Sequence, residues 1–109
     1  SDAIITGKLS AGDIASINLV KNELKPIFES YGVKKAILFG SIAKGTNTRS
    51  SDVDLLVDSG LKGLRFIGFA DEVKRAVGKE VDLFDVTHIE SGSRIDREIQ
   101  MTGVTVYEK

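Results

Sequence analysis

Four residues at the ends of apolar segments have the types and the spacing to do chemistry. Gly40 and Ser41 follow one apolar run, and Asp52 and Asp54 begin a second run eleven residues after the serine. Side chains alternate faces along a β-strand, so the two aspartates would project from the same face, about 6 to 7 Å apart at Cα. Two carboxylates held in this way can bind one hard cation such as Mg²⁺, which takes oxygen ligands and keeps coordination positions for phosphate.

Gly40 and Ser41 have the features of a phosphate-binding turn. Glycine lets the backbone approach a ligand closely, and amides in a turn that opens a helix favour phosphate oxygens. Beside paired carboxylates, such a turn suits in-line attack on a nucleotide phosphate, because metal ions held by carboxylates stabilise the attacking and leaving oxygens. A third carboxylate usually comes from another strand, and Asp82 in the β-rich segment 80–86 is a candidate.

The segments 40–45 (Gly-Ser-Ile-Ala-Lys-Gly) and 51–57 (Ser-Asp-Val-Asp-Leu-Leu-Val) together resemble the signature of the minimal nucleotidyltransferases, members of the DNA polymerase beta-like nucleotidyltransferase superfamily. The similarity covers most of the chain, from the helix expected to end near Tyr31 to the last expected strand. It implies an α/β (α+β) nucleotidyltransferase fold, with a central mixed β-sheet of about four strands flanked by helices. Residues 1–109 would form a single domain of this type.

The resemblance also implies roles for individual residues. The implied catalytic and Mg²⁺-binding residues are Asp52, Asp54 and Asp82. The implied nucleotide-binding residues are Gly40, Ser41 and Lys44. Asp82 would also help to activate the acceptor hydroxyl. The family often carries arginine at the position of Lys44, and lysine keeps the positive charge but lacks the bidentate fork that suits phosphate.

The implied activity is Mg²⁺-dependent transfer of a nucleoside monophosphate, with AMP from ATP as the expected case, to an acceptor hydroxyl with release of pyrophosphate. Small stand-alone members of the family are often antitoxins encoded beside a HEPN-type ribonuclease toxin, and some adenylylate that toxin. A HEPN-type toxin protein is therefore the expected partner. Two alternatives remain open: a non-catalytic antitoxin that sequesters its partner, and an aminoglycoside-type small-molecule nucleotidyltransferase, a class that usually needs a further helical domain.

Composition narrows the possible classes of protein. A length of 109 residues favours one domain, and a net charge of −1, from 15 Lys and Arg against 16 Asp and Glu, makes nucleic acid unlikely as the main partner. The chain has no cysteine, which excludes disulfides and cysteine-based zinc sites. No apolar stretch approaches the roughly 18 residues of a membrane span and no signal peptide is visible, so we expect a cytoplasmic protein.

Hydrophobic periodicity predicts the elements that must position these residues. Helical spacing predicts a helix from Ser10 to Tyr31 that is capped by Gly32, with a kink or a break at Pro26. The expected strands are 33–39, 52–58, 81–86 and 104–107. The further expected helices are 41–45, an amphipathic one from Leu61 to Val77 ending at Gly78, and a short one from Ser91 or Ser93 to Gly103. The apolar stripe expected of the amphipathic helix includes Leu64, Ile67 and Val73, and Gly63 and Gly68 are expected to weaken it. Residues 46–51 are expected to form a polar loop.

Other aspartates could replace the candidate carboxylates, and the candidate phosphate-binding residues have simpler explanations. Asp85 has the opposite parity to Asp82 on its strand, and Asp58 shares the face of Asp54 but lies farther along. The glycine turn could be structural only, and a Walker-type phosphate loop is excluded because Thr46 stands where that motif requires lysine. Lys44 could equally be an exposed helix residue. The residues expected to lie in loops or on the surface are His88, Arg75, Lys79, Arg94 and Arg97.

Overall fold

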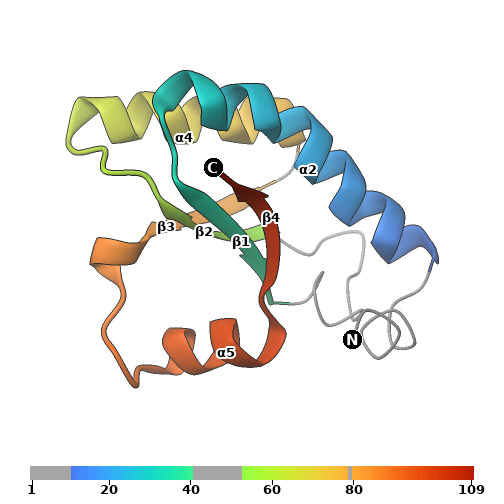
Figure 1. Ribbon diagram of the computed structural model, residues 1–109, viewed down its shortest axis with the longest axis vertical. Coiled ribbons are helices and arrows are strands. Elements are labelled where there is room, and N and C mark those ends of the chain that lie inside the picture. Colours follow the sequence, from blue (N-terminus) through green and yellow to red (C-terminus); the bar gives the residue numbers. More distant parts are fainter. Residues whose placement is uncertain (1–10, 41–52, 79) are drawn as a thin grey trace.

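One mixed β-sheet organises the protein. The computed structural model describes residues 11–40, 53–78 and 80–109 (Figure 1). The strands are β1 (Lys35–Phe39), β2 (Val53–Asp58), β3 (Val81–Asp85) and β4 (Val104–Glu108), in the sheet order β3-β2-β1-β4. Strand β1 runs antiparallel to both β2 and β4, whereas β2 and β3 are parallel. The predicted mixed sheet and all of its expected strands are confirmed.

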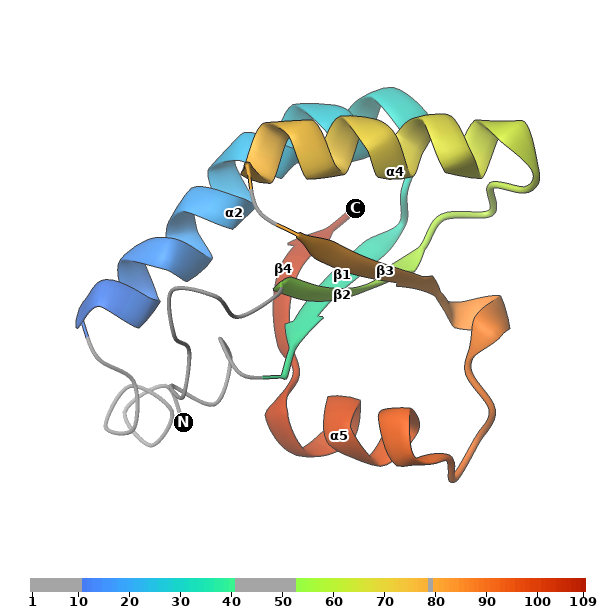
Figure 2. The ribbon, with the colours of Figure 1, turned by 180° about the vertical axis from the view of Figure 1, so that it is seen from behind.

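Helices cover both faces of this sheet. The described helices are α2 (Ala11–Tyr31), α4 (Leu64–Val77), α5 (Arg94–Thr102) and the 3₁₀ helix η1 (Val86–His88). Figure 1 and Figure 2 show α2 and α4 together on one face and α5 on the other. Within residues 11–40, 53–78 and 80–109, no helix is long and apolar enough to cross a membrane.

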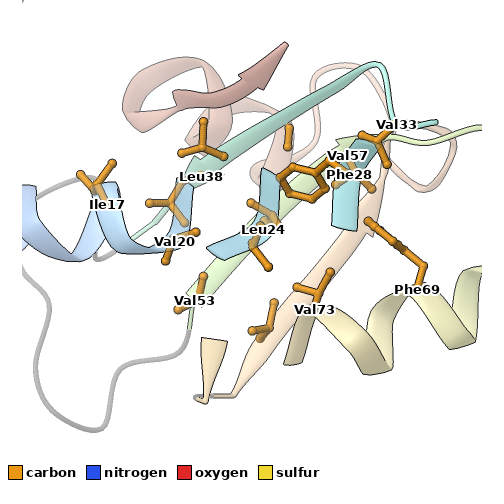
Figure 3. Packing of buried hydrophobic residues seen from close by; sticks show 14 residues of the cluster. Ile17, Val20, Leu24, Phe28, Val33, Leu38, Val53, Val57, Phe69 and Val73 are labelled. Carbon is orange, nitrogen blue, oxygen red and sulfur yellow. The ribbon is translucent and has the colours of Figure 1, made fainter. Parts of the chain in front are cut away.

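The main hydrophobic core lies between the sheet and helices α2 and α4 (Figure 3). Strand β2 contributes its odd-numbered residues, and these side chains are fully buried: Val53, Leu55 and Val57. Phe28 of α2 lies at the centre, with its ring centroid 6.1 Å from that of Phe69 on α4. Because Val53 and Leu55 point into this core, the side chain of Asp54 between them is directed to the opposite face of the sheet.

A smaller apolar cluster lies on that opposite face, beneath α5. Its buried members are Phe39, Leu56 and Ile99, and its half-buried members include Ile37, Phe84, Ile89 and Ile95. Leu56 and Phe84 are the even-numbered neighbours of Asp54 and Asp82 on their strands, so both aspartates share the α5 face. The two-sided burial of β2 therefore determines where its carboxylate points.

Two details of the helices differ from the prediction. Helix α2 continues without a break through Pro26. Proline has no amide hydrogen to donate to the carbonyl four residues earlier, which here is that of Asn22. Both residues are exposed, so the missing hydrogen bond lies on the solvent side of the helix. Helix α4 begins at Leu64 and not at Leu61, because Gly63, with φ +58°, occupies its N-cap. Gly63 is therefore a boundary residue and not a weak point inside the helix.

The predicted apolar stripe of α4 was wrong at its N-terminal end. Leu64 is 84% exposed and Ile67 is 62% exposed, whereas Phe69 and Val73 are buried. The buried stripe is rotated relative to the prediction, since Phe69 lies on the core side and shares that side with Val73, four residues later. The helix ends follow the expected glycines, with φ +72° at Gly32 and φ +73° at Gly78.

A polar contact joins the two helices that cover the main core. The Tyr31 hydroxyl donates a hydrogen bond to the Glu72 carboxylate, and this carboxylate raises the pKa of Tyr31 above its ordinary value. The guanidinium of Arg65 lies 5.9 Å from the centroid of the Tyr31 ring. A Cβ at Gly68 would lie 3.8 Å from the tyrosine oxygen, which is ordinary van der Waals contact, so this arrangement does not require glycine there.

Asp85 fixes the end of β3. Its side chain is only 2% exposed, and one carboxylate oxygen accepts hydrogen bonds from the Ser59 amide at 3.1 Å and the Ser59 hydroxyl at 2.6 Å. The other oxygen accepts from the Thr87 amide at 3.1 Å and hydroxyl at 2.8 Å. The Asp85 amide donates to Nδ1 of His88 at 3.1 Å, so the histidine, which was predicted to lie in a loop, belongs to the 3₁₀ helix η1 that follows the strand.

The hydrogen bonds of Asp85 make its ionised form part of the fold. Burial alone would raise its pKa, but the bonds donated by Ser59 and Thr87 hold the pKa below its ordinary value of 3.8. A lowered pKa in the folded state means that this stabilisation is fully present above the unfolded pKa. It is lost as the pH falls through the folded value.

We therefore expect Asp85→Asn to lower the free energy of unfolding at pH 7 by about 2 to 3 kcal/mol, because buried donors lose a charged acceptor. Below pH 3.8 the difference between the variant and the parent should shrink. Urea unfolding at several pH values measures both quantities. Asp71→Asn is the control, since this aspartate forms an exposed ion pair with Arg75 and should change stability by less than about 1 kcal/mol. An equal effect of the two changes would contradict the assignment.

Candidate active site

Asp54 and Asp82 lie side by side on neighbouring strands. The parallel register of β2 and β3 pairs these two residues directly. Paired residues on adjacent strands are about 4.8 Å apart, and here both side chains project from the face that α5 partly covers. Asp54 is half-buried, whereas Asp82 is exposed. The register thus brings together two carboxylates that are 28 residues apart in the sequence.

Gly40 closes one side of this carboxylate pair. It follows Phe39, which pairs with Asp54 across β1 and β2, and its φ of +84° is a conformation that other residues rarely adopt. A Cβ at this position would overlap Oδ2 of Asp54 and lie 3.2 Å from its Cγ. Glycine is therefore required here for two reasons, namely the backbone conformation and the space that the Asp54 carboxylate occupies.

The backbone amide of Gly40 is bound within the protein. It donates a hydrogen bond to Oγ1 of Thr102, at 3.1 Å, which links the residue after β1 to the last turn of α5. The same hydroxyl donates to the carbonyl of Glu98, at 2.8 Å. Sequence reasoning missed Thr102, because 62 residues separate it from Gly40 and its position in a short helix carries no signal of the contact.

Part of the predicted site lies outside the described residues. Those predicted residues are Ser41, Lys44 and Asp52, together with the expected helix 41–45 and loop 46–51. In the part of the chain that the structure describes, no group of three His, Asp or Glu side chains could hold a metal ion. The predicted set of three aspartates includes Asp52, so it stays a prediction. The donor types that are described, two adjacent carboxylates beside a glycine without a side chain, fit a hard cation with oxygen ligands.

The other nearby carboxylates have different positions. Asp58 shares the face of Asp54, but four residues of extended strand, about 13 Å, separate them. Asp85 lies at the far end of β3, where both of its carboxylate oxygens accept hydrogen bonds from Ser59 and Thr87. Asp82 is therefore the carboxylate of β3 that accompanies Asp54.

The free edge of β3 opens onto a depression beside Asp82. A cavity of about 500 Å³ lies between this strand and α4, and its lining includes Phe66, Lys74, Asp82 and Phe84. This cavity lies on the α4 side of the strand, whereas the Asp82 side chain projects from the α5 face and is itself exposed to solvent. Arg97, one of the residues expected on the surface, is exposed and donates to the Gly92 carbonyl at 3.2 Å, which agrees with a surface role.

Comparison with known proteins places this arrangement in a family. A family model described as polymerase beta, nucleotidyltransferase matches residues 22–109, more than half of the chain. The chain is also 36% identical over 76 residues to a Methanocaldococcus jannaschii protein that is provisionally named a protein adenylyltransferase. This match covers 68% of the chain and 82% of the relative.

Solved structures share the fold. A chain of a toxin–antitoxin structure with AMP-PNP superimposes with a TM-score of 0.65 at 23% identity, covering 82% of this chain and 73% of that one. A chain from the complex of a tri-AMPylated Shewanella oneidensis HEPN toxin with its MNT antitoxin gives a TM-score of 0.61 at 19% identity, covering 85% and 73%. At these identities the likeness establishes the fold alone.

We expect Gly40→Ala to lower stability by about 3 kcal/mol or more, because strain at positive φ adds to displacement of the Asp54 carboxylate. Gly92→Ala is the matched control, since Gly92 has φ +80° and no atom lies within 4 Å of the place that a Cβ would take. It should cost only about 1 to 2 kcal/mol. In an Asp54→Ala background, the excess cost at Gly40 should disappear, and chemical denaturation of the single and double variants measures this coupling. Equal costs at the two glycines would contradict the proposed contact.

Proposed function

The chain belongs to the polymerase beta nucleotidyltransferase family, and on that premise we propose that it transfers AMP from ATP to a hydroxyl group on a partner protein. Nucleotidyltransferase activity follows from the family, whereas the nucleotide, the metal and the acceptor are our proposal. The observation that carries it is the pairing of Asp54 with Asp82, in register and beside Gly40.

Asp52, Asp54 and Asp82 are the residues that would hold Mg²⁺. When bound, Mg²⁺ would neutralise phosphate charge and stabilise the attacking and leaving oxygens of an in-line displacement. The strand register pairs Asp54 with Asp82. In the proposed site, Asp52 would project beside Asp54, and the three aspartates would together provide oxygen donors for the metal. Oxygen donors of this kind are the ligands that Mg²⁺ prefers.

The protein would orient the substrates around these carboxylates. Ser41 and the backbone after Gly40 would bind the triphosphate, and Lys44 would add a positive charge beside it. The acceptor oxygen would form a bond to the α-phosphorus while the bond from that phosphorus to the bridging oxygen breaks, so pyrophosphate leaves with the electron pair. Asp82, as the exposed carboxylate, would accept the proton of the acceptor hydroxyl.

A protein acceptor suits the open side of the site. Asp82 is exposed and stands on β3, the edge strand of the described sheet, so a large partner could approach its carboxylate there. The relative in Methanocaldococcus jannaschii carries the name of a protein adenylyltransferase, and the Shewanella oneidensis structure contains an AMPylated HEPN toxin bound to an MNT antitoxin. We propose a HEPN-type toxin as the partner of this chain, with the chain acting as its antitoxin.

Incubation with a HEPN-type partner, ATP and Mg²⁺ should increase the mass of the partner by one or more AMP groups. The double variant Asp52→Asn, Asp54→Asn should bind the partner but leave its mass unchanged, because the carboxylates and not the docking surface are altered. Asp58→Asn is the control, since it removes a carboxylate from the same face of β2 at a distance from the pair, and it should transfer AMP normally. Intact-protein mass spectrometry measures each outcome.

Sequestration of the partner without AMP transfer would give a different result in the same experiment. If the parent and the double variant both neutralise the partner at a fixed stoichiometry without nucleotide, and the partner keeps its mass, the chain acts by sequestration. In that case the proposed transfer would be wrong, although the family assignment would stand.

We also expect Mg²⁺ to raise the melting temperature of the parent in a concentration-dependent way, because a ligand that binds only the folded state stabilises it. At a concentration of 100 times the dissociation constant, the gain is about 2.7 kcal/mol. Asp54→Asn should abolish this response, while Asp58→Asn should keep it. Thermal scans over a Mg²⁺ series provide the measurement, and a full response from Asp54→Asn would remove Asp54 from the metal site.

A further inference from the structure

Gly40 is held from two sides by elements that are distant in the sequence. On one side, the Asp54 carboxylate of β2 fills the space that a side chain would take. On the other side, the Gly40 amide donates to the hydroxyl of Thr102, at 3.1 Å. Gly40 is buried, so this hydroxyl supplies the acceptor that solvent cannot.

The direction of the hydrogen bonds at Thr102 follows from the chemistry of its partners. An amide can only donate and a carbonyl can only accept, so Oγ1 accepts from Gly40 and gives its own proton to the Glu98 carbonyl, at 2.8 Å. The hydroxyl is thus oriented by the helix and presents a lone pair to the turn. Valine at this position would have the same shape but could form neither bond.

The end of α5 that carries Thr102 is fixed against β1. Gly103 donates its amide to the Ile99 carbonyl at 2.7 Å, which ends the helix. A Cβ on Gly103 would lie 2.9 Å from Cγ2 of Ile37, so the absence of a side chain allows the close approach of helix and strand. Thr102 therefore occupies a defined position relative to the strand that leads into Gly40.

We propose that Thr102 is a positioning residue for nucleotide binding, which acts by holding Gly40 against the Asp54 carboxylate. The inference rests on the proposed function, since it assigns a purpose to the turn that would bind the triphosphate. Thr102 itself would touch neither the phosphate nor the metal. It orients the backbone amide of Gly40, the glycine that begins the proposed triphosphate-binding turn.

A purely structural role makes a different prediction. Threonine hydroxyls often bond to the carbonyl four residues earlier in a helix, and such a bond alone would only affect the stability of α5. In that case, the loss of the hydroxyl would lower the melting temperature without changing nucleotide affinity. Measurements of nucleotide affinity and of hydrogen exchange at the Gly40 amide therefore distinguish the positioning role from the purely structural one.

The test is a calorimetric titration with Mg²⁺ and α,β-methylene ATP, in which the bond broken in transfer is replaced by a stable one. Thr102→Val should weaken binding by about tenfold or more, because the buried amide of Gly40 loses its acceptor. Thr102→Ser keeps a hydroxyl and should stay within about twofold of the parent. Thr105→Val makes the same change at an exposed position on β4 and should leave the affinity unchanged.

Nuclear magnetic resonance gives a second readout without nucleotide. The Gly40 amide should be protected from hydrogen exchange in the parent and in Thr102→Ser, and lose protection in Thr102→Val. If Thr102→Val does not fold, Thr102→Ala replaces it in both experiments. Rapid hydrogen exchange of the Gly40 amide in the parent protein would by itself overturn the inference. Parent-like affinity in a folded Thr102→Val protein, or failure of Thr102→Ser to preserve binding, would also overturn it. If the parent itself does not bind the analogue, the proposed nucleotide site is wrong and this inference falls with it.

Discussion

The strict alternation of side chains along β2 is the constraint on which the rest of the structure depends. Val53, Leu55 and Val57 are fully buried in the main core, and the residues between them face α5. A shift of the register by one residue would bring Asp54 into the apolar core, where an isolated carboxylate costs many kcal/mol. The hydrophobic effect thus fixes the position of a polar site, because burial on one face determines which residues can reach the other.

Helix α5 has a different part in the architecture from α2 and α4. The two longer helices enclose the main core, whereas α5 covers a small cluster around Phe39, Leu56 and Ile99 and reaches the end of β1 with its last turn. Asp54 and Asp82 lie on the same side of the sheet as this helix. One short helix therefore both buries apolar surface and supplies the polar contact that holds the glycine turn.

Local patterns in the sequence were sufficient for most elements and insufficient for their mutual contacts. Apolar spacing predicted the strands, and glycines predicted the ends of α2 and α4. Leu64 and Ile67 were assigned to the wrong face of α4. Apolar residues recur every three or four positions on more than one face of this helix, and the spacing alone does not say which face is buried. Asp82 was a candidate because of its β-rich segment and received its role from the family resemblance, since the strand register that pairs it with Asp54 is a property of the folded sheet. The roles of Asp85 and Thr102 depend on partners far away in the chain, which a local pattern does not contain.

The hydrogen bond between Gly40 and Thr102 also has a consequence for the order of assembly during synthesis. The acceptor lies 62 residues after the donor, and β4, which completes the pairing of β1, follows the acceptor. A ribosome therefore presents β1, β2, α4 and β3 before Thr102, the acceptor of the Gly40 amide, has been made. Contacts this distant in the chain form late, because a long loop must close first. A nascent chain could thus pair Asp54 with Asp82 before the Gly40 amide has its acceptor on Thr102.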